Sequence, residues 1–287
     1  MRRGSSDDSA FFRGAYSARR RHGKLARMKR TLVVALLAGF TALALGNASQ
    51  TVIPPAIQAA VDAPDRSADD RALDAGRHPA QTLAFFGIRP GAHVAELGAG
   101  GGYTTELLAR VVGPDGGVFG QNSPFILERF AEKPWSLRLQ KPVMVAVKRL
   151  DRPFDDPFPD DVRELDAVLI VLLYHDTVWM KADRAKMNKA VFDALAPGGV
   201  YGIVDHSAKA GSGVADVESL HRIDEQVVKK EVEAAGFQLA GEADFLRNPQ
   251  DPRDWNASPR VAAEKRGTSD RFVLKFVKPA AVRPDAG

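Results

Sequence analysis

Short apolar runs alternate with segments of helical periodicity along most of the chain. The runs have the length of buried strands and are bounded by glycine, proline or charged residues. They lie at 93–97, 117–121, 143–148, 165–172, 199–205, 237–245 and 271–277. Helical patterns separate most of them. This alternation predicts an α/β domain with a doubly wound sheet of seven strands.

The first apolar run leads directly into a glycine-rich turn and then into a helix. Glu96 closes the strand, and Gly98, Gly100 and Gly102 follow at alternate positions before Tyr103 restores helical spacing. Glycine allows the backbone to turn through positive φ and allows a ligand to approach the main chain closely. The segment therefore predicts a binding site for a nucleotide-type cofactor.

The spacing of these glycines indicates which cofactor to expect. A nicotinamide dinucleotide fingerprint requires G-x-G-x-x-G, with the third glycine giving close packing of helix on strand. Gly98 and Gly100 match the first two positions, but Tyr103 stands at the third. The pattern disfavours a dinucleotide.

The order Glu96-x-Gly98-x-Gly100-x-Gly102 resembles motif I of class I S-adenosylmethionine-dependent methyltransferases. In that family the acid lies near the methionine end of the cofactor, where a carboxylate suits a sulfonium and an ammonium. The resemblance runs from about residue 78 to residue 279 and includes the turn at 195–199 before the fifth strand. It implies a Rossmann-like class I methyltransferase fold, mostly parallel with an antiparallel last strand, and S-adenosyl-L-methionine as the cofactor.

The resemblance also implies which residues contact the cofactor. These positions are Glu96, Gly98, Gly100, Gly102, Tyr103, Gln121, Asn122 and Asp151. Most members of the family end the second strand with an acid that binds both ribose hydroxyls, whereas this chain has Gln121 and Asn122 there. An amide is a weaker acceptor than a carboxylate. By analogy with the family, Asp151 is expected to contact the adenine end of the cofactor.

Candidate catalytic residues follow two later strands. Ligands of doubly wound sheets bind outside the carboxyl ends of the strands, which brings His175, Asp176 and His206 toward one crevice. Methyl transfer is an in-line displacement, so the enzyme positions the acceptor and removes its proton. We expect His175 to be the base and Asp176 to orient it, with His206 as the competing base. The alternative is that each histidine only caps a strand end or binds a loop.

A metal site is a further possibility. Asp205, His206, His175 and His221 offer nitrogen and oxygen ligands that the topology brings toward the same edge. Some O-methyltransferases use a divalent cation to acidify the acceptor hydroxyl. Because no ligand motif of close spacing is present, we expect no metal.

The N-terminal region has the layout of a secretory signal peptide. A basic Met28-Lys29-Arg30 precedes an uncharged run from 31 to 46,. We expect a basic extension and signal peptide at 1–46 with the true start at Met28, a tether at 47–66, a methyltransferase-like domain at 67–279 and a tail at 280–287. The protein is then exported and periplasmic; the alternative is a membrane anchor at 31–61.

Three short motifs also indicate an exported protein. Gln-Asn-Ser-Pro at 121–124, Tyr-His-Asp at 174–176 and Asp-His-Ser-Ala at 205–208 resemble a bacterial subgroup of predicted methyltransferases that often carry export signals. The acceptor is then a small molecule or a component of the cell envelope, and membrane contact occurs only through the N-terminal segment. Nothing in the sequence indicates an oligomeric state.

Charge and cysteine content exclude several classes of function. The chain carries a net charge of +4, but residues 1–46 hold ten Lys and Arg against two Asp, so the remainder is mildly acidic. We therefore expect no nucleic-acid partner. The absence of cysteine excludes disulfides and a cysteine nucleophile,. Two alternatives to an active methyltransferase stay open: a non-catalytic exported ligand-binding module on the same fold and, more distantly, an NAD(P)-binding oxidoreductase.

Overall fold

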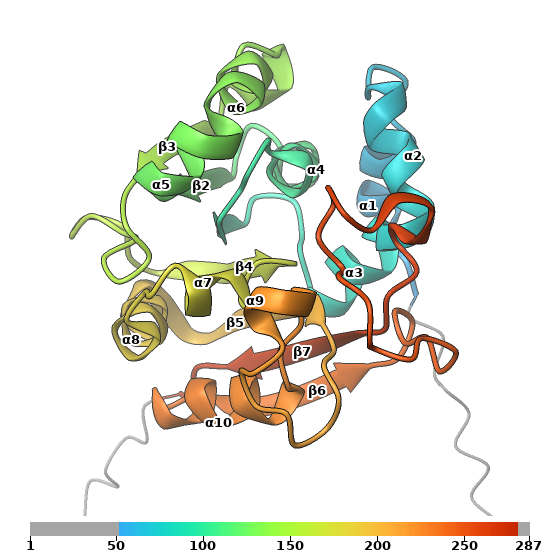
Figure 1. The fold of residues 1–287 in the computed structure, drawn as a ribbon. Helices are drawn as coiled ribbons and strands as arrows, with labels where there is room; N and C mark the ends of the chain where they lie inside the picture. Colours follow the sequence, from blue (N-terminus) through green and yellow to red (C-terminus); the bar gives the residue numbers. More distant parts are fainter. Residues whose placement is uncertain (1–51, 281–287) are drawn as a thin grey trace, which may run out of the picture. The chain divides into compact units, whose positions relative to one another are not determined.

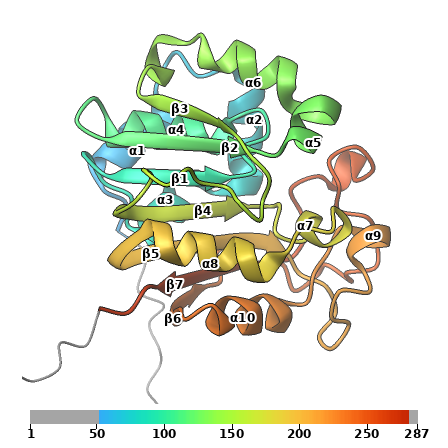
Figure 2. The ribbon, with the colours of Figure 1, turned by 90° about the vertical axis from the view of Figure 1, so that its left-hand side faces the viewer.

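A single seven-stranded sheet forms the centre of the computed structural model, which describes residues 52–280. The strand order is β3-β2-β1-β4-β5-β7-β6. The strands are β1 (His93–Leu97), β2 (Gly117–Asn122), β3 (Val147–Asp151), β4 (Leu165–Val171), β5 (Leu195–His206), β6 (Gln238–Ala243) and β7 (Arg271–Val277). Figure 2 shows this order from top to bottom.

The direction of the strands confirms the predicted fold class. β1 pairs in parallel with β2 and β4, β2 with β3, and β4 with β5. β7 runs antiparallel to both of its neighbours, β5 and β6. The order reverses at β1 and β4, so the carboxyl ends of these two strands flank the position where such folds bind ligands.

Helices cover both faces of the sheet. They are α1 (Pro55–Asp62), α2 (Ala68–Arg77), α3 (Pro79–Phe86), α4 (Tyr103–Val112), α5 (Pro124–Ile126), η1 (Leu127–Ala131), α6 (Glu132–Leu139), η2 (Pro142–Met144), α7 (Asp176–Trp179), α8 (Arg184–Ala194), α9 (Val217–Leu220), α10 (Glu225–Ala234) and η3 (Ala263–Lys265). α8 and α10 lie in front of the sheet in Figure 2, and α1, α2 and α4 lie behind it. Figure 1 shows the short α7 and α9 side by side near the middle of the view, and Figure 2 shows both beyond the right-hand ends of the strands.

The first βα unit shows why the sequence folds in this way. Val94, Ala95 and Leu97 are fully buried in β1. Gly102 has a φ of 82° immediately before α4, and Gly113, with a φ of 68°, ends that helix. Burial of the apolar strand and the apolar helix face supplies the main driving force, and the two glycines provide backbone conformations that other residues adopt only at a cost.

Strand β3 differs from the prediction. The apolar run at 143–148 led us to expect a strand there, whereas β3 begins at Val147 and residues 142–144 form the 3₁₀ helix η2. Val145 is 90% exposed. β3 is an edge strand, and its position follows from pairing with β2, in which Val118 lies opposite Val147 and Asn122 opposite Asp151. Apolarity is a weak guide to such a strand.

The segment predicted to be a tether is partly folded. Residues 55–62 form α1, in which Ile57 is fully buried and Ala60 is 4% exposed, and the helix packs on α3 and α4. Residues 55–61 of this helix also belong to the alternative anchor at 31–61. The signal peptide, the start at Met28 and the rest of that anchor lie outside the described residues, as do residues 281–287 of the predicted tail. Within residues 52–280, no helix has the length and hydropathy needed to cross a membrane.

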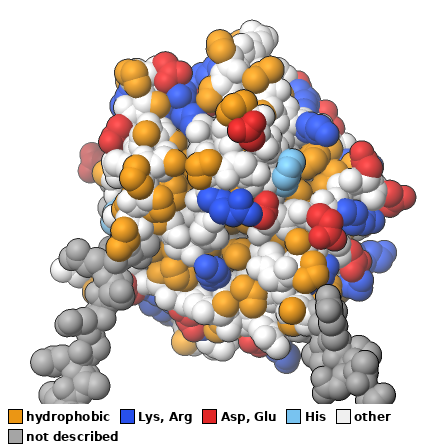
Figure 3. All heavy atoms as spheres, turned by 180° about the vertical axis from the view of Figure 1, so that it is seen from behind, with side chains coloured by type: hydrophobic (Ala, Val, Ile, Leu, Met, Phe, Trp, Pro, Cys, Tyr) orange, Lys and Arg blue, Asp and Glu red, His pale blue; other side chains and the backbone are white. Residues whose placement is uncertain are grey.

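Two long connections surround the carboxyl end of β5. One runs from 207 to 224 and includes α9, and the other runs from 244 to 270 and includes η3. Arg222 ties them together: its guanidinium is fully buried and pairs with Asp251 at 2.8 Å. The opposite side of the molecule carries basic, acidic and apolar side chains intermixed (Figure 3).

Candidate active site

The glycine loop after β1 has one open position. Gly98, Gly100 and Gly102 all have positive φ, at 66°, 55° and 82°. A Cβ on Gly98 would lie 2.3 Å from the Leu173 side chain, and one on Gly102 would lie 2.5 Å from the Trp135 ring, so a larger residue at either position would displace a packed side chain. A Cβ on Gly100 would meet no atom within 4 Å. The loop backbone is therefore open to a ligand at Gly100.

Gln121 and Asn122, at the end of β2, hold this loop in place. The Gln121 side chain accepts a hydrogen bond from the Gly98 N–H at 2.9 Å and donates to the Arg152 carbonyl at 2.5 Å. Asn122 accepts from the Gly100 N–H at 2.8 Å and donates to the Gly100 carbonyl at 3.1 Å. Both side chains are fully buried. Their structural role was not foreseen, and a direct contact with the ribose stays a prediction.

Glu96 lies beneath the start of α4 and is 3% exposed. The Thr105 hydroxyl donates to its carboxylate. Burial raises the pKa of Glu96 to about 7, although the bonds from Thr105 and Thr104 and the charge of Arg77 lower it. The group therefore titrates near neutrality, and a cation bound close to it would favour its charged form.

Tyr103 and Asp151 have partners away from the glycine loop. The Tyr103 hydroxyl donates to Asp74 of α2 at 2.6 Å. Asp151 is exposed and forms an ion pair with Arg149 at 2.8 Å. In this structure both side chains serve contacts within the protein, so a cofactor contact by either would require it to exchange a partner.

Arg77 is a charged residue near the loop that the sequence analysis missed. Its guanidinium lies over the Tyr103 ring at 4.4 Å and, within residues 52–280, makes no hydrogen bond. Burial lowers the pKa of Arg77, while Tyr103 and Glu96 act in the opposite direction. It stands at the end of a polar helix before a histidine and a proline, so its sequence carries no signal of a site. A carboxylate ligand would satisfy this cation.

The strand ends bring His175, Asp176, Asp205 and His221 together. His175 Nδ1 lies 2.7 Å from Asp205 Oδ1, and the His175 backbone N–H donates to Asp205 Oδ2 at 2.7 Å. His175 Nε2 lies 3.0 Å from Asp176 Oδ1 and 3.3 Å from His221 Nδ1. His221 Nδ1 is 3.1 Å from Asp176 Oδ1. We call His175, Asp176 and His221 the histidine cluster.

The surroundings of His175 favour its protonated form, and its role as the base stays a prediction. Burial opposes a charge on His175, but Asp205 and Asp176 outweigh it and raise the pKa of His175 to about 10. The imidazole is thus protonated at neutral pH, with each nitrogen beside a carboxylate. Asp176 does lie beside His175, as expected, but it stabilises the proton there. A base must give up that proton before it can accept another.

His206 lies beside the cluster but is not part of it. Its Nδ1 is 2.7 Å from the Ser269 hydroxyl, and its ring centroid is 5.7 Å from that of His175. Burial and the positive charge of His175 lower the pKa of His206 well below its usual value. Asp205 is also outside the cluster, because it binds Nδ1 of His175, the nitrogen that faces away from Asp176 and His221. The four residues considered as metal ligands therefore do not converge as one set.

Two residues with unusual backbone conformations lie in or beside the histidine cluster. Leu172, between β4 and His175, has a φ of 57°, and His221 has a φ of 51°. Such conformations are costly for non-glycine residues and are found preferentially at functional sites. Tyr174 turns away from the edge, because its hydroxyl donates to Glu231 at 2.9 Å. Trp179, by contrast, donates to Asp176 at 2.7 Å.

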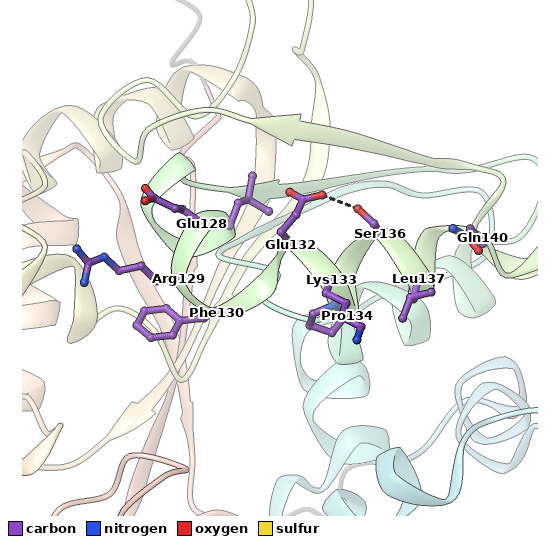
Figure 4. A pocket seen from close by; sticks show the side chains of 10 residues that line it. Glu128, Arg129, Phe130, Glu132, Lys133, Pro134, Ser136, Leu137 and Gln140 are labelled. Carbon is purple, nitrogen blue, oxygen red and sulfur yellow. Dashed lines mark hydrogen bonds between the residues drawn. The ribbon is translucent and has the colours of Figure 1, made fainter.

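One groove lies apart from these strand ends. It has a volume of about 500 Å³ and is lined by residues of η1 and α6, together with Gln140; Figure 4 shows these side chains. The Glu132 and Ser136 side chains in it are joined by a hydrogen bond of 2.6 Å. None of the predicted site residues lines it, so we do not assign it to the cofactor.

Comparisons with known proteins agree with this architecture. Residues 56–136 match the family Protein-L-isoaspartate(D-aspartate) O-methyltransferase (PCMT). A chain from a Haloferax volcanii complex that contains the Trm112 methyltransferase activator superposes on this chain with a TM-score of 0.51 and 18% sequence identity. The match covers 79% of this chain and 99% of that one. The chain has the class I methyltransferase fold. A comparison with curated protein sequences gives no significant match.

Two other solved structures are similar to this methyltransferase fold. The [4+2]-cyclase SpnF has a TM-score of 0.50 and 15% identity, over 74% of this chain and 81% of that one. An S-adenosylmethionine-dependent methyltransferase from Aquifex aeolicus has a TM-score of 0.47 and 16% identity, over 68% and 86%. The name of the cyclase shows that fold alone does not decide the reaction.

The family match and the fold support S-adenosylmethionine as the cofactor, and the residues present fit it. Gly100 leaves room for a ligand against the backbone. Glu96, buried beside the loop, suits the positive charges of the methionine end, and Arg77 suits its carboxylate,. The nicotinamide alternative is not favoured, because Tyr103 fills the third glycine position and binds α2.

Proposed function

We propose that this protein transfers a methyl group from S-adenosylmethionine to a small molecule or an envelope component. The observation that carries the proposal is the open backbone at Gly100 within an intact motif I. The histidine cluster stands at the end of β4, the strand beside β1 in the sheet. Cofactor and acceptor sites at neighbouring strand ends are what an in-line displacement requires.

The chain's own residues have distinct parts in this reaction. Gln121 and Asn122 hold the glycine loop, and Glu96 and Arg77 bind the charged groups of the methionine end. The histidine cluster orients the acceptor. The proton of the acceptor would pass to solvent at the partly exposed Asp176 and His221. The freed lone pair of the acceptor would form the bond to the methyl carbon, and the electrons of the broken carbon–sulfur bond would stay on sulfur, which gives S-adenosylhomocysteine.

Labelled methyl transfer tests this proposal. The full chain is incubated with S-adenosylmethionine carrying a tritiated methyl group, with either a small-molecule extract or an envelope fraction. Label in one fraction, together with S-adenosylhomocysteine, supports the proposal and selects the acceptor class. Binding of the cofactor with no transfer to any fraction would favour the non-catalytic module instead.

We also propose that the protein is exported and belongs to the bacterial subgroup whose members carry export signals. The support is the basic segment at 28–30 followed by the uncharged run at 31–46,. Small residues at Ala44 and Gly46 predict cleavage before Asn47. N-terminal sequencing of the protein from a periplasmic extract is expected to begin at Asn47; a protein that keeps its N-terminal segment in the membrane fraction would instead indicate the anchor.

A further inference from the structure

We propose that the histidine cluster binds a divalent transition-metal ion. Three ligand atoms converge there: His175 Nε2, Asp176 Oδ1 and His221 Nδ1. Their separations are 3.0, 3.1 and 3.3 Å, so they form a nearly equilateral triangle. Two imidazole nitrogens and one carboxylate oxygen are a known ligand set for such ions.

The size of the triangle suits a metal. Bonds from nitrogen and carboxylate oxygen to these ions are about 2.0–2.2 Å long. An ion at that distance from all three atoms sits slightly above their plane, with ligand–metal–ligand angles close to a right angle. The three residues then occupy one face of the coordination sphere, and the remaining positions are free for water or an acceptor oxygen.

A further hydrogen bond holds each of the three metal-binding residues in this orientation. Asp205 accepts from His175 Nδ1 at 2.7 Å, which leaves Nε2 pointing toward the triangle, the arrangement usual for metal-binding histidines,. The Trp179 indole donates to Asp176 Oδ1 at 2.7 Å. The left-handed backbone of His221 ends α9, where its N–H binds the Val217 carbonyl at 3.1 Å.

An ion has a route to the site from one side. The His175 side chain is only 3% exposed, but those of Asp176 and His221 are 20% and 26% exposed. The buried ligand thus forms the floor, and the two partly exposed ligands form the rim. The mixed nitrogen and oxygen set favours Mn²⁺, Fe²⁺, Co²⁺ or Zn²⁺ over Mg²⁺ and Ca²⁺, which prefer oxygen ligands alone.

The role of the site rests on the proposed function. A cation at the acceptor site lowers the pKa of a hydroxyl bound to it. The acceptor would therefore be an oxygen nucleophile whose hydroxyl reaches the rim formed by Asp176 and His221. This assignment also removes the need for His175 as a base.

Metal binding can be measured without any methyl transfer. The full chain, purified without a histidine tag and stripped with a chelator, is titrated with Zn²⁺ and with Co²⁺, whose absorption spectrum reports the ligands. We expect one ion per chain. His221→Ala is expected to weaken binding at least tenfold and to change the cobalt spectrum, while Asp205→Asn weakens binding about 10–100-fold through His175.

His93→Ala is the matched control, because His93 is exposed at the start of β1 and lies outside the cluster. It is expected to bind the ion as the wild type does, and circular dichroism checks that each variant is folded. No stoichiometric ion in the wild type, or equal affinity in His221→Ala, would overturn the proposal. S-adenosylmethionine binding is measured separately on the same stripped protein, so loss of the metal proposal and loss of the methyltransferase proposal give different results.

Discussion

Single residues at this site are shaped by burial more than by their type. Glu96 was expected to be an ordinary carboxylate beside a cation, but its burial raises its pKa to about 7. His175 was expected to be a base, but two carboxylates keep it protonated in the metal-free protein. In both cases the surroundings of the side chain set its charge.

The burial of Glu96 predicts that replacing it raises the stability of the fold but weakens binding of the cofactor. The unfolded chain releases the Glu96 proton near pH 4.5 and the folded chain near pH 7, so stability falls as pH rises through this window,. Glu96→Gln removes this loss. Urea unfolding should show a gain below about 1 kcal/mol at pH 5 that grows to about 3 kcal/mol at pH 8.

The same substitution should weaken binding of S-adenosylmethionine, because an amide does not attract the cationic methionine end. Thr105→Val, which removes the hydroxyl that donates to Glu96, serves as a comparison that keeps the carboxylate. A gain in stability that does not change with pH would contradict the raised pKa of Glu96.

At the scale of elements, the parallel strands position the site and the loops complete it. The carboxyl ends of β1, β2 and β4 supply the glycine loop, its two supporting amides and most of the histidine cluster, and β5 supplies Asp205, which contacts His175. This much follows from the order of apolar runs, because the ends of parallel strands share one edge. His221, which follows α9 in a long connection, was expected only near this edge, and the structure shows that it contacts His175 and Asp176.

The support of the glycine loop by β2 can be tested at Asn122. Asn122→Ala leaves the buried Gly100 N–H without its acceptor, at a cost of about 1–3 kcal/mol,. We expect the thermal midpoint to fall modestly and the affinity for S-adenosylmethionine to fall by at least tenfold, measured by calorimetry. Gln140→Ala, at an exposed amide after α6, should change neither. Unchanged affinity in Asn122→Ala would show that the loop keeps its shape without this side chain.

At the scale of the whole molecule, the folded domain begins closer to the N-terminus than the sequence pattern predicted. The Pro- and Ala-containing composition of 47–66 is typical of a linker, and only two buried residues, Ile57 and Ala60, distinguish α1 from one. The fold class was predicted correctly because seven apolar runs carry a strong signal. The hydrogen bonds of Tyr103 and Tyr174 could not be predicted from the pattern, since they depend on distant partners in α2 and α10.

The packing of α1 predicts unequal effects of two substitutions near the start of the domain. Ile57 is fully buried, so Ile57→Ala should lower the free energy of unfolding by about 2–5 kcal/mol in urea titrations,. Val52 is 86% exposed, and Val52→Ala should change it by less than about 0.5 kcal/mol,. If residues 55–62 were a tether, the two variants would behave alike.

The central claim is that S-adenosylmethionine binds at the glycine loop, and calorimetry of the full chain with this cofactor and with S-adenosylhomocysteine tests it most directly. Gly100→Val places a branched side chain where the loop is open. Gly87→Val is its matched control, since Gly87 also has positive φ, 76°, and open space around its Cβ, but lies after α3. We predict binding by the wild type and by Gly87→Val and loss of binding in Gly100→Val. No binding by the wild type, or equal binding by both variants, would contradict the account.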